Sequence, residues 1–105
     1  MERARVDPKL VDEFVYGNTL AFGQGSRTWG RMSMFYAGLP PESGLMAVNR
    51  MCASGLQACV SIAESIIAGR INCGVGAGVE SMSFGKFAIP DESIWDGAMD
   101  TEYGE

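Results

Sequence analysis

Short apolar runs alternate along this chain with amphipathic segments, and turn-forming residues separate them. β-Favourable residues predict a strand over residues 13–16, which a Gly–Asn pair ends. Two further apolar runs predict strands over residues 45–49 and 71–79, the latter apolar on both faces as in a sheet covered by helices. Helical spacing of apolar side chains predicts a short helix over residues 31–37, closed by a glycine, after a glycine-rich loop over residues 22–30.

The best-defined element is a helix that begins at Ser54. Ser54 and Gln57 have the spacing of a capping box, and Gly69 is a natural stop. Few polar residues interrupt the segment, so we expect a mostly buried helix. The apolar stripe follows the i, i+3, i+4, i+7 spacing of one helix face and consists of Leu56, Cys59, Val60, Ala63, Ile66 and Ile67.

Strands that alternate with helices predict an α/β fold, and 105 residues allow one domain at most. The hydrophobic content of 47% and the 14 glycines fit a closely packed structure. Gly74, Gly76 and Gly78 resemble a phosphate-binding loop, but no helix start follows them. Close packing of a strand against a helix explains these glycines better.

Charge and composition narrow the function classes. The net charge is −5 at pH 7 and the basic residues are scattered, which argues against nucleic-acid binding. No signal-peptide pattern is present, and no apolar run is long enough to predict a membrane span. We predict no metal site. Helical spacing could align a set of carboxylates that are better explained as a solvated face, namely Glu92, Asp96 and Asp100.

The candidate catalytic residue is Cys52, which lies where the strand over residues 45–49 turns into the following helix. A thiol there is close to the positive end of the helix dipole, which favours its anionic, nucleophilic form. Cys59 and Cys73 are expected to be packing residues, and no C-x-x-C redox motif exists. The chain contains no histidine, the usual base for such a thiol. Either Cys52 is not a nucleophile, or its partner lies outside these residues.

Several segments resemble thiolases, most closely the degradative 3-ketoacyl-CoA thiolases. The specific matches are VNRMCASGLQA, AGR-x-N and GVESMS, and VYGNTL, GQG and AGLP precede them in the order of the family. WDGAMDTEYGE resembles the start of the family's loop domain. The resemblance divides the chain into residues 1–83, a partial N-terminal domain, and residues 84–105, the start of the loop domain. C-A-S-G-L-Q-A and G-V-E-S-M-S favour thiolases over the related ketosynthases.

The resemblance implies an αβα sandwich and an acyltransferase mechanism. Cys52 corresponds to the nucleophile that attacks the 3-keto carbonyl of a 3-ketoacyl-CoA, holds the acyl group as a thioester and passes it to free CoA. The backbone N–H of Cys52 would donate to the thioester oxyanion. CoA is a substrate, and no metal or prosthetic group is needed. The full-length family member is expected to be a homo-oligomer inside the cell, in the peroxisome, the mitochondrial matrix or the cytoplasm.

The same resemblance shows what this chain lacks. The family's activating histidine and second cysteine have no match here. Of the family's usual asparagine–proline–alanine–arginine loop, only the arginine has a match, Arg31. The family's first strand, between those over residues 13–16 and 71–79, is also absent. Unless the strands re-pair, we therefore expect an incomplete half with unpaired backbone groups and marginal stability. The alternative function is a non-catalytic thiolase fragment that retains a packing or dimer-contact surface.

Overall fold

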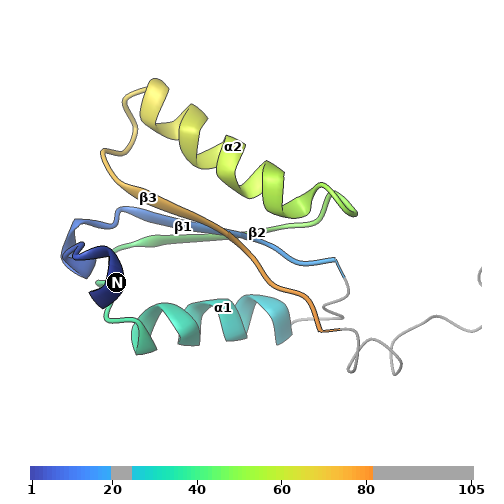
Figure 1. Ribbon diagram of the computed structural model, residues 1–105, viewed down its shortest axis with the longest axis horizontal. Helices are drawn as coiled ribbons and strands as arrows, with labels where there is room; N and C mark the ends of the chain where they lie inside the picture. The colour runs from blue at the N-terminus through green and yellow to red at the C-terminus, as the bar shows by residue number, and fades with distance from the viewer. Residues whose placement is uncertain (20–24, 82–105) are drawn as a thin grey trace, which may run out of the picture.

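The computed structural model describes residues 1–19 and 25–81 and shows three layers (Figure 1). A parallel sheet lies between helix α1 on one face and helix α2 on the other. This confirms the predicted α/β class and the αβα sandwich. The elements in chain order are η1 (Glu2–Ala4), η2 (Pro8–Leu10), β1 (Glu13–Gly17), α1 (Gly25–Tyr36), β2 (Gly44–Val48), α2 (Ser54–Ile67) and β3 (Gly74–Gly78).

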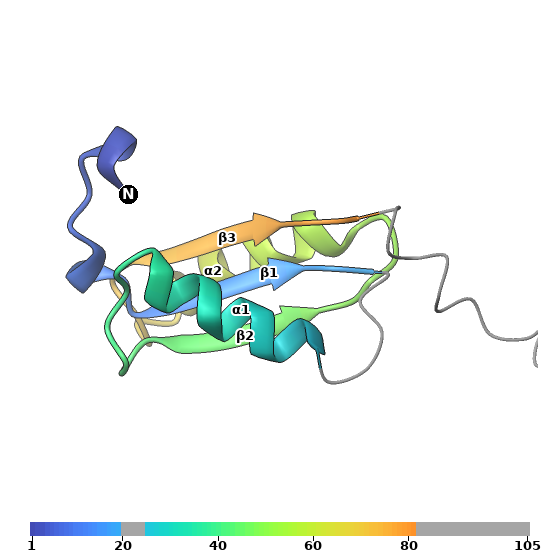
Figure 2. The same ribbon diagram turned by 90° about the horizontal axis from the view of Figure 1, so that it is seen from below.

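The sheet has the strand order β2-β1-β3, so β1 is the central strand (Figure 2). Glu13 aligns with Gly44 of β2 on one side and with Gly74 of β3 on the other. The strands have re-paired, which is the alternative under which no unpaired backbone groups are expected between β1 and β3. With no strand between them, β1 and β3 pair directly along their whole length, which leaves only the outer edges of β2 and β3 open.

Each face of the sheet has its own small core. Val11, Met34 and Leu39 form one cluster, to which α1 contributes Met34. Val15 packs with Ala58 and Ile62 of α2 on the opposite face. Phe14 of β1 packs against the first cluster and its neighbour Val15 belongs to the second, because neighbouring residues of a strand point to opposite faces.

Helix α1 begins earlier than predicted. Residues 25–30, predicted as loop, are helical, and the helix ends near the predicted position. Gly30 contributed to the loop prediction, but it is buried against β1, where a Cβ would lie 2.5 Å from the Tyr16 ring. Gly30 is thus needed for close packing rather than for a turn. Gly38, with φ +80°, closes the helix as predicted.

The predicted capping box at the start of α2 is wrong. Ala53 occupies the N-cap without a side-chain bond, and Ser54 is the first helical residue. The Ser54 hydroxyl is used in the preceding turn, where it accepts from the Arg50 N–H at 2.8 Å. Gln57 bonds to Arg50 and Ser61 instead of reaching back to the cap. The end of the helix is as predicted, with Gly69 at φ +70°.

The predicted burial of α2 is also wrong, because the helix turns its small residues to the sheet. Its buried residues are Ser54, Ala58, Ile62 and Ser65. Members of the predicted apolar stripe face solvent instead: Leu56 is 70% exposed and Ile67 is 85% exposed. Cys59, predicted to be a packing residue, is exposed as well.

The glycines of β3 explain this orientation. A Cβ on Gly76 would lie 2.8 Å from the Cα of Cys59, and one on Gly74 would lie 2.8 Å from the Ile62 side chain. The packing interpretation of these glycines is therefore confirmed. Because β3 has glycines at these positions, the backbone of α2 lies so close to it that only small side chains, or the end of a flexible side chain, fit between them.

Within residues 1–19 and 25–81, no helix is both long enough and apolar enough to cross a membrane. The predicted boundary between residues 1–83 and 84–105, and the acidic positions Glu92, Asp96 and Asp100, lie outside the described residues.

Candidate active site

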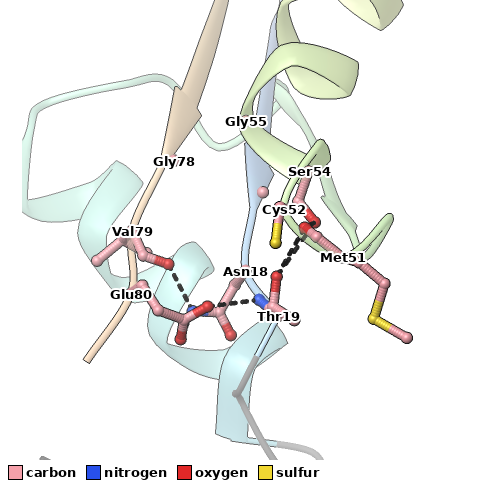
Figure 3. Close-up of a pocket in the computed structure, with 10 residues that line it drawn as sticks. Asn18, Thr19, Met51, Cys52, Ser54, Gly55, Gly78, Val79 and Glu80 are labelled. Atoms are coloured by element: carbon pink, nitrogen blue, oxygen red, sulfur yellow. Dashed lines mark hydrogen bonds between the residues drawn. The ribbon is translucent and has the colours of Figure 1, made fainter. Parts of the chain in front are cut away.

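The carboxyl ends of β1 and β3 and the start of α2 surround an open pocket of about 480 Å³. Parallel strands end at one edge of a sheet, where loops and helix starts gather and where α/β proteins commonly bind ligands. Figure 3 shows this pocket with its lining side chains. The lining residues are Gly17, Asn18, Thr19, Met51, Cys52, Ser54, Gly55, Gly78, Val79 and Glu80.

Cys52 lies two residues before the first residue of α2 and is exposed at this pocket. Its sulfur points into the pocket, toward the end of β1 (Figure 3). This position agrees with the predicted strand–turn–helix placement of the thiol. Cys59 and Cys73 do not line the pocket. Cys52 is therefore the one cysteine of the three that the fold brings to this edge.

The turn before Cys52 has an unusual backbone. Met51 has φ +51°, a left-handed conformation that costs a non-glycine residue about 1–2 kcal/mol. The Ala53 N–H donates to the Arg50 carbonyl, and the Ser54 N–H donates to the Met51 carbonyl, each at 3.1 Å. The N–H of Cys52 forms no hydrogen bond within the described residues. A free donor thus lies beside the thiol.

Backbone contact holds α2 at this place. A Cβ on Gly17, the last residue of β1, would lie 2.3 Å from the carbonyl carbon of Ser54 and 2.5 Å from the nitrogen of Gly55. Only a glycine permits this approach. The end of β1 therefore fixes the height of the first turn of α2 above the sheet, and with it the position of Cys52.

A carboxylate closes the pocket on the side of β3. Glu80 accepts from the Thr19 N–H at 2.9 Å through one oxygen and from the Asn18 amide at 3.4 Å through the other (Figure 3). The Asn18 amide also donates to the Val79 carbonyl at 2.7 Å. The Asn18 carbonyl oxygen is buried and has no hydrogen-bond partner in the described part of the chain. These bonds join β1 to β3 beyond the last paired residues.

Sequence reasoning missed Thr19 as part of this site, and from the family resemblance it assigned Glu80 only to a loop near the pocket. Both are polar residues two positions after the end of a strand. In a parallel sheet that position is itself a signal, because the ends of all strands meet at one edge. Arg31, the matched residue near the 22–30 loop, does not line the pocket: its guanidinium donates to the Ser43 carbonyl at 2.6 Å and lies 4.8 Å from the centre of the Phe35 ring.

The fold and the site define an α/β protein with an exposed thiol at a helix start, at the carboxyl edge of a parallel sheet. The family described as "Thiolase, N-terminal domain" matches residues 1–105 of this chain. The chain therefore belongs to the thiolase family, which is a family of acyltransferase enzymes.

Individual relatives agree with this assignment. The peroxisomal 3-ketoacyl-CoA thiolase of Yarrowia lipolytica is 45% identical over 83 residues, which cover 79% of this chain and 20% of that protein. The peroxisomal 3-ketoacyl-CoA thiolase 2 of Arabidopsis thaliana is 38% identical over 99 residues, which cover 94% of this chain and 20% of that protein. This chain thus spans about a fifth of the length of the curated relatives it matches.

Solved structures show the same fold. The acetyl-CoA acetyltransferase of Bacillus anthracis superposes with a TM-score of 0.69 at 33% identity, over 78% of this chain and 21% of that one. Human mitochondrial 3-ketoacyl-CoA thiolase in complex with CoA superposes with a TM-score of 0.61 at 27% identity, over 67% of this chain and 18% of that one. The structural likeness again falls on a small part of each longer protein.

Proposed function

We propose that Cys52 is the acyl-accepting nucleophile of a thiolase that cleaves 3-ketoacyl-CoA with CoA. The observation that carries this proposal is the position of the thiol: it is exposed at a helix start and points into the pocket at the carboxyl edge of the sheet. Family membership supplies the reaction class. The substrates are the 3-ketoacyl-CoA and free CoA, and no metal or prosthetic group takes part.

The reaction proceeds in two halves. The Cys52 thiolate attacks the 3-keto carbon, and the bond between carbons 2 and 3 breaks. Its electron pair leaves on acetyl-CoA, which takes up a proton, and the shortened acyl group stays on sulfur as a thioester. The thiol of free CoA then attacks this thioester, which releases a shortened acyl-CoA and restores Cys52. Each step needs a proton donor or acceptor close to the sulfur.

The backbone supports the thioester oxyanion in this proposal. The Cys52 N–H forms no hydrogen bond within the described residues, whereas those of Met51, Ala53 and Ser54 are used in the turn. A preorganised N–H donor of this kind stabilises the charge that develops on the carbonyl oxygen. The Cys52 N–H is thus the donor we assign to the oxyanion.

A second candidate function, a non-catalytic fragment, rests on a different observation. The chain has no histidine, and it spans about a fifth of its relatives. The base that would activate the thiol is therefore not among these 105 residues. We accordingly expect this chain alone to accept an acyl group slowly and not to turn over. The peroxisomal names of the relatives make the peroxisome the compartment we propose.

Intact-mass measurement after incubation with acetoacetyl-CoA tests the proposal. One acyl group per chain is expected, and the adduct should disappear in Cys52→Ala. Cys59→Ala is the matched control, because Cys59 is exposed but lies outside the pocket, and this variant should keep the adduct. A chain that takes up no acyl group, or one that loses the adduct in Cys59→Ala, would contradict the proposed role and leave the non-catalytic fragment as the better account.

A further inference from the structure

The left-handed turn at Met51 is held by hydrogen bonds from neighbouring residues and by one from Thr19, which follows β1. A strained residue persists in a fold only where surrounding contacts over-determine its conformation. Within the described part of the chain, the only non-glycine residues with positive φ are Met51 and Arg5. Met51 directly precedes Cys52, so whatever holds its peptide groups also orients the thiol.

Both peptide groups of Met51 are bonded. Its N–H donates to the side-chain oxygen of Asn49 at 3.1 Å. Its carbonyl accepts from the Thr19 hydroxyl at 2.9 Å and from the Ser54 hydroxyl at 2.5 Å. The Thr19 and Ser54 hydroxyls also lie 3.3 Å apart, so they form one cluster over this carbonyl.

Thr19 differs from the other two partners because it belongs to another part of the fold. Asn49 and Ser54 lie within three residues of Met51, whereas Thr19 follows β1, 32 residues earlier in the chain. The Asn49 amide donates to the Thr19 carbonyl at 3.2 Å, which adds a second bond between the same two segments. The Thr19 N–H is in turn bonded to Glu80 after β3. Thr19 therefore anchors the turn to the sheet.

We propose that Thr19 and Asn49 are positioning residues for the Cys52 thiol, which they orient by holding both peptide groups of Met51. The inference rests on the proposed function in that it takes Cys52 as the reactive group. It adds two residues that form no hydrogen bond with the Cys52 sulfur within the described part of the chain. Their effect reaches the sulfur through the Met51 peptide, so removing either should turn the thiol away from the open pocket through which a reagent reaches it.

The test is the rate of alkylation of Cys52 by iodoacetamide in the full 105-residue chain, divided by the rate at Cys59 in the same molecule. Cys59 is also exposed and so reports any general loosening. Thr19→Val keeps the shape of the side chain and removes its donor. We expect this variant to lower the ratio about fivefold, the factor that corresponds to one net hydrogen bond of ~1 kcal/mol.

Rescue and control variants separate positioning from general structure. Thr19→Ser keeps the hydroxyl and should keep the ratio within about twofold of the wild-type chain. Ser33→Ala removes a hydroxyl that donates to the Trp29 carbonyl on α1, on the other face of the sheet, and should leave the ratio unchanged. An unchanged ratio in Thr19→Val, or an equal loss in Thr19→Ser, overturns the proposal. If Thr19→Val does not fold, the same ratio is measured in Asn49→Ala, where an unchanged ratio overturns the proposal.

The readout is independent of acyl transfer, so the two proposals can fail separately. A chain whose Cys52 accepts no acyl group from acetoacetyl-CoA, but whose alkylation ratio falls in Thr19→Val and returns in Thr19→Ser, loses the proposed function and keeps the positioning. A chain that is acylated at Cys52 with the same alkylation ratio in all variants keeps the function and loses the positioning.

Discussion

At each end of the sheet a carboxylate accepts hydrogen bonds from the backbone, but the surroundings of the two carboxylates differ. At the amino end, Asp12 accepts from the N–H groups of Asn72 and Cys73 at 2.8 and 3.1 Å. At the carboxyl end, Glu80 accepts from Thr19 and Asn18. Both join the β1 side of the sheet to the β3 side, but Glu80 lines the pocket described above and Asp12 does not.

The remaining bonds at the two ends explain this difference. At the amino end the Asp12 backbone pairs with Cys73 and Gly44, and the Ser43 hydroxyl donates to the Val11 carbonyl. At the carboxyl end there are a strained turn, an exposed thiol and, within residues 1–19 and 25–81, a Cys52 N–H without a hydrogen bond. The amino end therefore serves stability, and the carboxyl end gives up some stability to present Cys52.

Gly17→Ala should have the largest effect, because it destabilises the carboxyl end of the sheet. The added methyl group would meet the backbone of Ser54 and Gly55 at 2.3–2.5 Å, which no rotamer change can relieve. We expect a loss of unfolding free energy of about 2–3 kcal/mol and displacement of the start of α2. Urea denaturation followed by circular dichroism measures it.

The matched control lies at the other end of the sheet. Gly44 begins β2, and a Cβ there would meet its nearest neighbour at 3.5 Å, an ordinary contact. Gly44→Ala should change stability by less than about 1 kcal/mol. Equal losses in the two variants would mean that close packing of α2 on the end of β1 does not hold the site.

Asp12→Asn tests the amino end through its pH dependence. The N–H groups of Asn72 and Cys73 hold the pKa of the Asp12 carboxyl below its usual range. A depressed pKa stabilises the folded chain above the pKa of the unfolded state, and this stabilisation is lost as the pH falls through the folded value. The variant should therefore melt earlier than the wild-type chain at pH 7.

The difference between the two chains should shrink on acidification toward pH 2. Thermal melts at several pH values measure this difference directly. A gap in melting temperature that stays constant over the whole range would show that the Asp12 charge does not contribute through these two bonds.

Met51→Gly should have the smallest effect on the free energy of unfolding, and it should stabilise the folded chain. Glycine adopts φ +51° without the strain that a side chain adds there, and the Met51 side chain is 72% exposed, so little packing is lost. We expect a gain of up to ~1 kcal/mol in unfolding free energy. A loss of stability instead would mean that the Met51 side chain, and not only its peptide groups, supports the turn.

Much of the fold could be predicted from the sequence because apolar runs and helix stops are local signals. The three strands and Gly38 and Gly69 as helix ends follow from such signals. The buried face of α2 could not be predicted in the same way. The pattern identifies the apolar residues, but the glycines of β3 determine that small residues such as Ala58 meet the sheet.

The candidate site likewise has a part that follows from a local signal and a part that depends on strand pairing. The position of Cys52 just before α2 could be predicted because its motif is contiguous and the strand–turn–helix context is local. Thr19 meets Glu80 only because β1 and β3 lie side by side, a pairing that the sequence did not predict because the family has a further strand between them. Contacts that depend on which strands pair are therefore the part that required the structure.

The most direct test of the account is the distribution of the acyl group among the three cysteines after exposure of the whole chain to acetoacetyl-CoA. Peptide mapping by mass spectrometry gives the fraction on each. Nearly all of the thioester should be on Cys52, although Cys59 is exposed as well. An equal distribution over Cys52 and Cys59, or acylation of Cys59 alone, would contradict the claim that this fold presents Cys52 for acyl capture.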